Sequence, residues 1–139
     1  MNHNGSPKTR VLVVDDDKTL LNMYKERLEA SGYQVITAVN GEIALSKAVE
    51  TLPHIILLDI MMPKENGFDV LNIVKSTPET KNIPVIILTA LTQENHKQKG
   101  IADGADDYII KSEVMPKQVV QKIEKVISEH RKKFEEMAK

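Results

Sequence analysis

Residues 11–17 read VLVVDDD, and this stretch decides the class of the fold. Its first four residues are continuously apolar and rich in Val, which is typical of a strand buried on both faces of a parallel sheet. Three consecutive carboxylates, Asp15, Asp16 and Asp17, stand directly after this run. The stretch therefore predicts a buried strand that leads into an acidic loop.

Short β-branched runs recur along the chain, and those at 55–58 and 85–88 are also continuously apolar. They occupy residues 35–39, 55–58, 85–88 and 108–110. The intervening segments carry apolar residues at helical spacing, as at Leu45, Ala48, Val49 and Leu52. Strands that alternate with helices indicate an α/β domain with a parallel sheet and right-handed crossovers. All strands then end at one edge, which is where such folds place their function.

Local signals set the expected helix ends. Gly32 ends the first helix, Asn40 caps the second, and Asn66 opens the third. Residues 92–103 are weakly apolar, so we expect a short or mobile fourth helix there. The final helix is expected to begin after Pro116 and to run almost to the end of the sequence.

The composition excludes several classes of protein. With 41% hydrophobic and 28% charged residues, the 139-residue chain suits one globular domain. A net charge of −1 argues against direct binding to nucleic acid. The absence of Cys excludes disulfides, thiolate metal sites and thiol nucleophiles. The apolar runs are too short for membrane insertion and no signal peptide is visible, so a cytoplasmic protein is expected.

Polar residues follow other predicted strands at the same edge. Asp59 follows the third strand, Thr89 ends the fourth, and Lys111 follows the fifth. Neighbouring carboxylates repel one another unless a cation lies between them, and oxygen ligands from two loops suit Mg²⁺. A nucleophilic carboxylate, a hydroxyl and an ammonium group are sufficient for phosphoryl transfer. Taken singly, Thr89 would be a local hydrogen-bonding residue and Lys111 a solvated surface residue.

Asp17 has a second interpretation. Asp at a strand-to-helix junction often caps the helix that follows. Lys18-Thr19-Leu20 begins such a helix directly after Asp17. The residue is therefore either a helix cap or a member of the acidic site.

The motifs together resemble the receiver domain of two-component response regulators. The resemblance rests on residues 13–17, 57–63, Gly67, 87–90 and 104–111. It implies a flavodoxin-like fold, a doubly wound five-stranded parallel sheet with strand order 2-1-3-4-5. The receiver domain is expected over residues 10–128. Residues 1–9 are expected to form a disordered arm or a cloning remnant, and residues 129–139 an extension of the last helix.

The resemblance implies that Asp59 is the phosphoacceptor. The phosphoryl group would come from a phosphohistidine on a sensor histidine kinase or a histidine phosphotransfer protein. Asp15 and Asp16 would help to hold Mg²⁺, with Asp16, Asp59 and the backbone carbonyl of Met61 as direct ligands. Such a chain promotes its own phosphorylation and dephosphorylation but turns over no separate substrate.

The resemblance also implies a switch. Lys111 would pair with phosphoryl oxygens, Thr89 would bond to one of them, and Tyr108 would be the switch aromatic that turns inward. The output face would be built by the fourth helix, fifth strand and fifth helix. A downstream protein target or an output domain outside this chain would bind there. A homodimer through this face or through the C-terminal helix is a further expectation.

One residue departs from the pattern of the family. Ser112 follows Lys111, where the family usually has a proline, commonly after a cis peptide bond. A cis bond before Ser would cost about 3–4 kcal/mol, so we expect a trans bond. The position of Lys111 and the shape of the loop after it stay open.

An alternative function comes from a different class of protein. Asp15, Asp17 and Thr19 match the D-x-D-x-T signature of haloacid-dehalogenase-type phosphatases, with Asp15 as nucleophile and Asp17 as acid/base. That class places a later acidic pair at a strand end, whereas Asp106-Asp107 precedes a strand, and it leaves Asp59 unexplained. A flavin-binding module of the same fold is disfavoured because three carboxylates in its first loop would repel a phosphate.

The last predicted helix carries a heptad stripe. It consists of Val120, Ile123, Ile127, His130, Phe134 and Met137. The first half of the stripe is expected to pack against the sheet. The second half is either a dimerising or linking helix, or an amphipathic tail in water.

Overall fold

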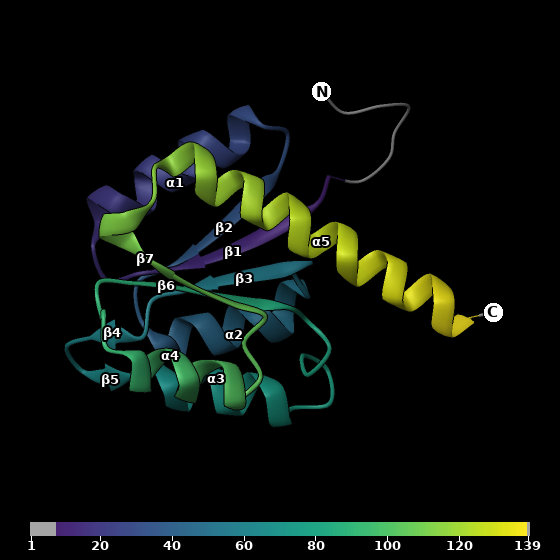
Figure 1. Ribbon diagram of the computed structural model, residues 1–139. Coiled ribbons are helices and arrows are strands. Elements are labelled where there is room, and N and C mark those ends of the chain that lie inside the picture. The colour runs from purple at the N-terminus through teal and green to yellow at the C-terminus, as the bar shows by residue number, and fades with distance from the viewer. Residues whose placement is uncertain (1–7, 139) are drawn as a thin grey trace.

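A five-stranded parallel sheet forms the centre of the protein, shown in Figure 1 as a computed structural model that describes residues 8–138. The strand order is β2-β1-β3-β6-β7. The strands are β1 (Arg10–Val14), β2 (Gln34–Ala38), β3 (Ile55–Leu58), β6 (Val85–Thr89) and β7 (Asp107–Ile110). When the five strands of this sheet are numbered along the chain, their spatial order is 2-1-3-4-5. The predicted flavodoxin-like topology is therefore confirmed.

Helices cover both faces of the sheet (Figure 1). Helices α1 (Lys18–Ala30) and α5 (Pro116–Ala138) lie on one face. Helices α2 (Gly41–Thr51), α3 (Gly67–Ser76) and α4 (Glu94–Ala102) lie on the other. As predicted, the fourth helix is short.

Each face of the sheet has its own apolar core, which explains the continuously apolar strands. Along β1, Val11 and Val13 pack in the core beneath α1 and α5. Leu12 and Val14 pack in the core beneath α2 and α3. Because side chains alternate between the faces of a strand, a strand covered on both sides must be apolar at every position.

Side-chain caps fix where the helices begin. Asp17 Oδ1 accepts hydrogen bonds from the backbone N–H groups of Thr19 and Leu20 at 3.0 and 3.2 Å. Asn40 and Asn66 cap α2 and α3 in the same way. The predicted cap at Asn40 and the predicted start of the third helix at Asn66 are confirmed, and the cap interpretation is the correct one for Asp17.

Two small elements were not predicted. Strands β4 (Met61–Met62) and β5 (Glu65–Asn66) form a short antiparallel hairpin between β3 and α3. A 3₁₀ turn, η1 (Lys111–Glu113), follows β7. No peptide bond between described residues is cis, so the bond from Lys111 to Ser112 is trans, as expected.

Two expectations fall wholly or partly outside the described residues. Most of the expected N-terminal arm, residues 1–7, lies there, as do the side chains of Phe134 and Met137 in the heptad stripe. Over residues 8–138, no helix is long and apolar enough to span a membrane.

Candidate functional site

Three carboxylates meet at the carboxyl-terminal edge of the sheet. Asp15 follows β1 and Asp59 follows β3, and these two strands are paired neighbours. One oxygen from each of Asp15, Asp16 and Asp59 lies within 4.8 Å of the other two. Asp15 and Asp59 are each only 5% exposed, whereas Asp16 is exposed. The strand order reverses between β1 and β3, which is where this class of fold binds ligands.

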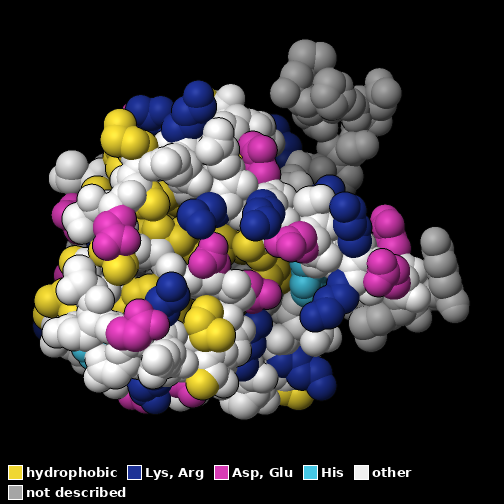
Figure 2. Space-filling model, in the orientation of Figure 1, with side chains coloured by type: hydrophobic (Ala, Val, Ile, Leu, Met, Phe, Trp, Pro, Cys, Tyr) yellow, Lys and Arg dark blue, Asp and Glu magenta, His cyan; other side chains and the backbone are white. Residues whose placement is uncertain are grey.

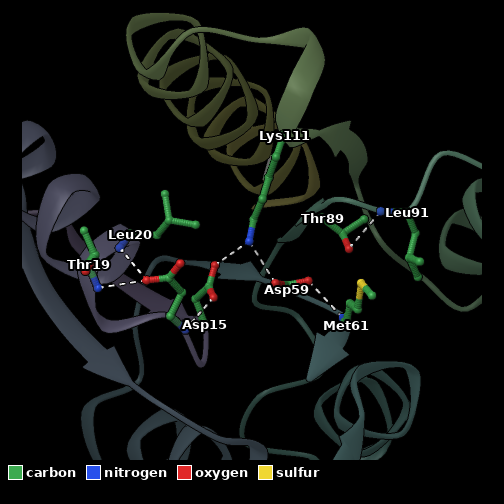
Figure 3. Close-up of polar contacts among 9 residues, drawn as sticks. Asp15, Thr19, Leu20, Asp59, Met61, Thr89, Leu91 and Lys111 are labelled. Atoms are coloured by element: carbon green, nitrogen blue, oxygen red, sulfur yellow. Dashed lines mark hydrogen bonds and ion pairs between the residues drawn. The ribbon is translucent and has the colours of Figure 1, made fainter. Parts of the chain in front are cut away.

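Lys111 joins the two buried carboxylates (Figure 3). Its Nζ lies 2.7 Å from Asp15 Oδ2 and 2.9 Å from Asp59 Oδ2. Burial acts to lower the pKa of Lys111, but its hydrogen bonds to the two carboxylates outweigh burial and raise the pKa. Lys111 is therefore a permanent cation in the site. Although Ser112 stands where the family usually has proline, the ammonium group of Lys111 lies within the cluster.

Backbone N–H groups hold the other oxygens of the buried carboxylates. Asp15 Oδ1 accepts the N–H of Asp17 at 2.9 Å, and Asp59 Oδ1 accepts the N–H of Met61 at 2.9 Å (Figure 3). Each carboxylate is thus fixed on one side by the loop after its strand and on the other by Lys111. Their orientation is set before any ligand binds.

The charges of the cluster suit a hard divalent cation. Three carboxylates face one ammonium group, so two negative charges lack a partner within the cluster. All the acidic ligands are oxygens from two loops, and one of them, on Asp16, is open to solvent. Such a donor set fits Mg²⁺, which binds through a few carboxylates and keeps several waters.

Thr89 and Tyr108 lie near this edge and hold the loop after β6. Thr89 is fully buried, and its Oγ1 accepts the N–H of Leu91 at 3.4 Å. The Oη of Tyr108 donates to the carbonyl oxygen of Leu91 at 3.0 Å. Burial raises the pKa of Tyr108, and the charge of Asp59 adds to this effect. Sequence reasoning missed this pair of contacts, because a backbone partner such as Leu91 leaves no side-chain signal.

The site is not a closed pocket. A hollow of ≈ 540 Å³ adjoins the acidic cluster, and its lining includes Asp16, Met61 and Leu91. Met61, one of the lining residues, is 55% exposed. A side chain of another protein can therefore approach the cluster from solvent.

The family follows from comparison with known proteins. The family model for the response regulator receiver domain matches residues 11–124. The fold and the acidic site agree with that match. The chain belongs to the receiver domains of two-component response regulators.

Individual relatives support the assignment. Over 102 residues the chain is 42% identical to the response regulator PleD of Caulobacter vibrioides and 44% identical to the transcriptional regulatory protein CpxR of Escherichia coli. These matches cover 73% of this chain, but only 22% of PleD and 42% of CpxR. The chain thus spans less than half the length of these curated relatives.

Solved structures show the same fold. A CheY-like receiver domain protein from Methanospirillum hungatei superposes with a TM-score of 0.85 at 28% identity, covering 91% of this chain and 99% of that one. Chemotaxis protein CheY4 of Vibrio cholerae gives a TM-score of 0.81 at 32% identity, covering 86% and 99%.

The phosphatase alternative is not favoured. It needs Asp17 as an acid/base, but the carboxylate of Asp17 caps α1 through two hydrogen bonds. The family match covers the whole stretch on which that alternative rested.

Proposed function

We propose that Asp59 accepts a phosphoryl group from a phosphohistidine of a sensor histidine kinase or a histidine phosphotransfer protein. The observation that carries the proposal is the fixed geometry of Asp59, which lies between Lys111 and the N–H of Met61 with two further carboxylates beside it. An oxygen of Asp59 attacks phosphorus, the bond from phosphorus to the imidazole nitrogen breaks, and the imidazole leaves with the bonding electron pair.

Mg²⁺ is part of the proposal. Asp15, Asp16, Asp59 and the backbone carbonyl of Met61 would hold it. When bound, it would offset the negative charge of the carboxylates and of the phosphoryl oxygens. Lys111 contributes the positive charge that the chain itself supplies.

The new phosphoryl group would switch the residues around it. It adds roughly 1.5 to 2 negative charges and three strong acceptors. Lys111 pairs with one phosphoryl oxygen, and the Thr89 hydroxyl leaves Leu91 to donate to another. Tyr108 shares Leu91 as a partner, so movement of that loop reaches Tyr108 and the output face of α4, β7 and α5.

The partners follow from this role. The phosphodonor would dock at the hollow beside Asp16 and Met61. The switched face would bind a downstream protein, an output domain or a second copy of this chain. We place the protein in the cytoplasm and assign it no separate substrate to turn over.

Intact mass spectrometry tests the proposal. The protein is incubated with acetyl phosphate and Mg²⁺ as wild type, Asp59→Asn and Asp69→Asn, the last being an exposed Asp on α3 and a matched control. The wild type and Asp69→Asn are expected to gain one phosphoryl group. Asp59→Asn, and wild type in EDTA, are expected to gain none.

Two outcomes would overturn the proposal. The first is a wild type that gains no phosphoryl group. The second is steady phosphate release that survives Asp59→Asn but is lost in Asp15→Asn, which would restore the phosphatase alternative.

A further inference from the structure

A second cavity lies at the opposite edge of the sheet, where β6 and β7 begin. Its volume is ≈ 290 Å³. It is lined by Lys75 of α3, by Lys81, Asn82 and Pro84 before β6, by Gly104 and Asp106 before β7, and by His130 and Lys133 of α5. One wall therefore belongs to the part of α5 beyond Ile127, which is the last core residue of the helix among the side chains that the structure describes.

The cavity concentrates positive charge in a chain whose net charge is −1. Three lysines line it against a single carboxylate, that of Asp106. Lys75 Nζ lies 4.0 Å from Asp106 Oδ1, which also accepts the N–H of Val85 at 2.9 Å. Figure 2 shows Lys and Arg side chains along the extending part of α5, with Asp and Glu side chains among them.

Lys81 and Lys133 supply the surplus charge. Both are exposed, and neither has a carboxylate within 4.0 Å among the residues that the structure describes. With Lys75 opposite Asp106, these two ammonium groups leave the cavity with two positive charges in excess.

The surroundings of the cavity lower the pKa values of Lys75 and His130. Lys75 is half-buried and donates to the carbonyl oxygen of Ile83 at 2.7 Å, and burial lowers its pKa against the opposing effect of Asp106. Burial also lowers the pKa of His130, where the positive charges of Lys75 and Lys133 act in the same direction and Asp106 opposes them. A bound anion would favour the charged forms of both groups.

We propose that this cavity binds a small multivalent anion of the phosphate class. Lys75, Lys81 and Lys133 provide the charge, the amide of Asn82 provides directional hydrogen bonds, and His130 forms part of the wall. The volume of ≈ 290 Å³ is just below the roughly 300–1,000 Å³ typical of small-molecule sites, which suits a small phosphate compound. This site is separate from Asp59 and does not depend on the proposed phosphorylation.

Such a ligand would act on α5. His130 and Lys133 lie on the extending part of α5, whereas Lys81 and Asn82 lie in the loop before β6. An anion held between them ties the extension to the body of the domain.

The test uses pyrophosphate as the probe with the whole 139-residue chain. Pyrophosphate is titrated in EDTA at constant ionic strength while backbone amide NMR signals are followed. Saturable shifts are expected at Asn82, Gly104 and Lys133. The double variant Lys81→Gln/Lys133→Gln is expected to bind about tenfold more weakly, because two charge-assisted contacts are lost.

The matched control removes two exposed lysines of α5 that lie outside the cavity, Lys117→Gln/Lys125→Gln. It is expected to change the affinity less than twofold, about 0.4 kcal/mol. Equal weakening in both double variants would mean non-specific attraction and would overturn the proposal. Absence of saturable shifts, or shifts confined to Thr89 and Lys111 at the other edge, would also overturn it.

Discussion

Lys111 balances only part of the charge at the acidic edge. Its ammonium group contacts Asp15 and Asp59, while Asp16 has no such contact among the described residues. The carboxylates lie within 4.8 Å of one another, so repulsion between them works against folding when no cation is bound. The site therefore lowers the stability of the ligand-free protein.

Asp16→Asn tests this conclusion. Removal of one charge from the cluster is expected to raise the free energy of unfolding in EDTA by about 0.5–1 kcal/mol. At a Mg²⁺ concentration 100 times the Kd of the wild type, the free energy of unfolding of the wild type is expected to rise by about 2.7 kcal/mol. The same concentration is expected to stabilise the variant much less. Urea unfolding with EDTA and with Mg²⁺ measures both effects. Equal stabilisation of the two proteins by Mg²⁺ would contradict the role proposed for Asp16.

His54 gives a pH dependence. Its Nδ1 accepts the N–H of Arg10 at 2.9 Å, and burial first, then the charges of Arg10 and Arg131, lower its pKa. Because the folded-state pKa lies below the unfolded value, the stabilisation is full above about pH 6.5 and is lost as the pH falls through the lowered pKa. We expect His54→Gln to lose less stability than wild type between pH 7 and pH 5. The melting temperatures of both proteins are measured across this pH range. An equal fall in the two proteins would contradict the role given to His54.

Convergence of the site residues was predictable from the sequence, because carboxyl ends of parallel strands share one edge. Asp15, Asp59 and Lys111 each follow a strand and do meet there. The contacts of Tyr108 and Thr89 with Leu91 were not predictable. They depend on where one backbone group lies in space, which no residue type encodes.

At the level of elements, prediction succeeded where burial imposes a pattern. The inner strands β1, β3 and β6 are almost wholly apolar because helices cover them on both faces. The hairpin of β4 and β5 was missed because strands of two residues are too short to show a period of two. Helix α4 was predicted to be short because it has little to bury, and Gly100 is its single buried residue within the described chain.

The start of α3 depends on a glycine. A Cβ at Gly67 would lie 2.2 Å from the Cα of Ile60, and a backbone atom cannot move aside as a side-chain end can. Gly67 also donates its N–H to the carbonyl oxygen of Ile60 at 3.1 Å. The contact fixes α3 against the segment that follows Asp59.

Gly67→Ala is therefore expected to lower the free energy of unfolding by about 3 kcal/mol. It is also expected to slow phosphorylation by acetyl phosphate, since the segment after Asp59 must shift. Asn72→Ala, at an exposed position of the same helix, is the control and should change stability by less than about 0.5 kcal/mol. Urea unfolding measures the stability of the wild type, Gly67→Ala and Asn72→Ala. A Gly67→Ala protein as stable as Asn72→Ala would contradict the packing argument.

On the scale of the whole molecule, α5 has two unequal parts. Val119, Ile123 and Ile127 pack into the core beneath the sheet. Beyond them, Arg131 donates an exposed hydrogen bond to Thr9 at 3.2 Å, and His130 lies in the basic cavity. The first part belongs to the core, while the described side chains of the second part lie at the surface or line the basic cavity.

Deletion of residues 131–139 tests this division. The deletion is expected to change the free energy of unfolding by less than about 1 kcal/mol, because the hydrogen bond that the described residues of this segment make, from Arg131 to Thr9, is exposed. Ile123→Ala, by contrast, is expected to cost about 2–5 kcal/mol through the cavity it leaves in the core. Urea unfolding compares the two. A deletion as costly as Ile123→Ala would show that the extension is packed, and sedimentation would then show whether a second copy covers it.

The all-parallel main sheet also shapes how the chain must fold. Val11 of β1 pairs with Val35 of β2 and Ile55 of β3, and Ile86 of β6 pairs with Asp107 of β7. Each of these pairings closes a loop of roughly 20 residues or more, so the entropy of closure is lost before contacts compensate for it. The main sheet contains only parallel pairs, so it has no hairpin that could form first as a local nucleus. During synthesis, β1 therefore forms before either of its partner strands is available. Only the face of β1 that carries Val11 and Val13 can be covered early, by α1, whereas Leu12 and Val14 stay exposed until α2 and α3 have formed.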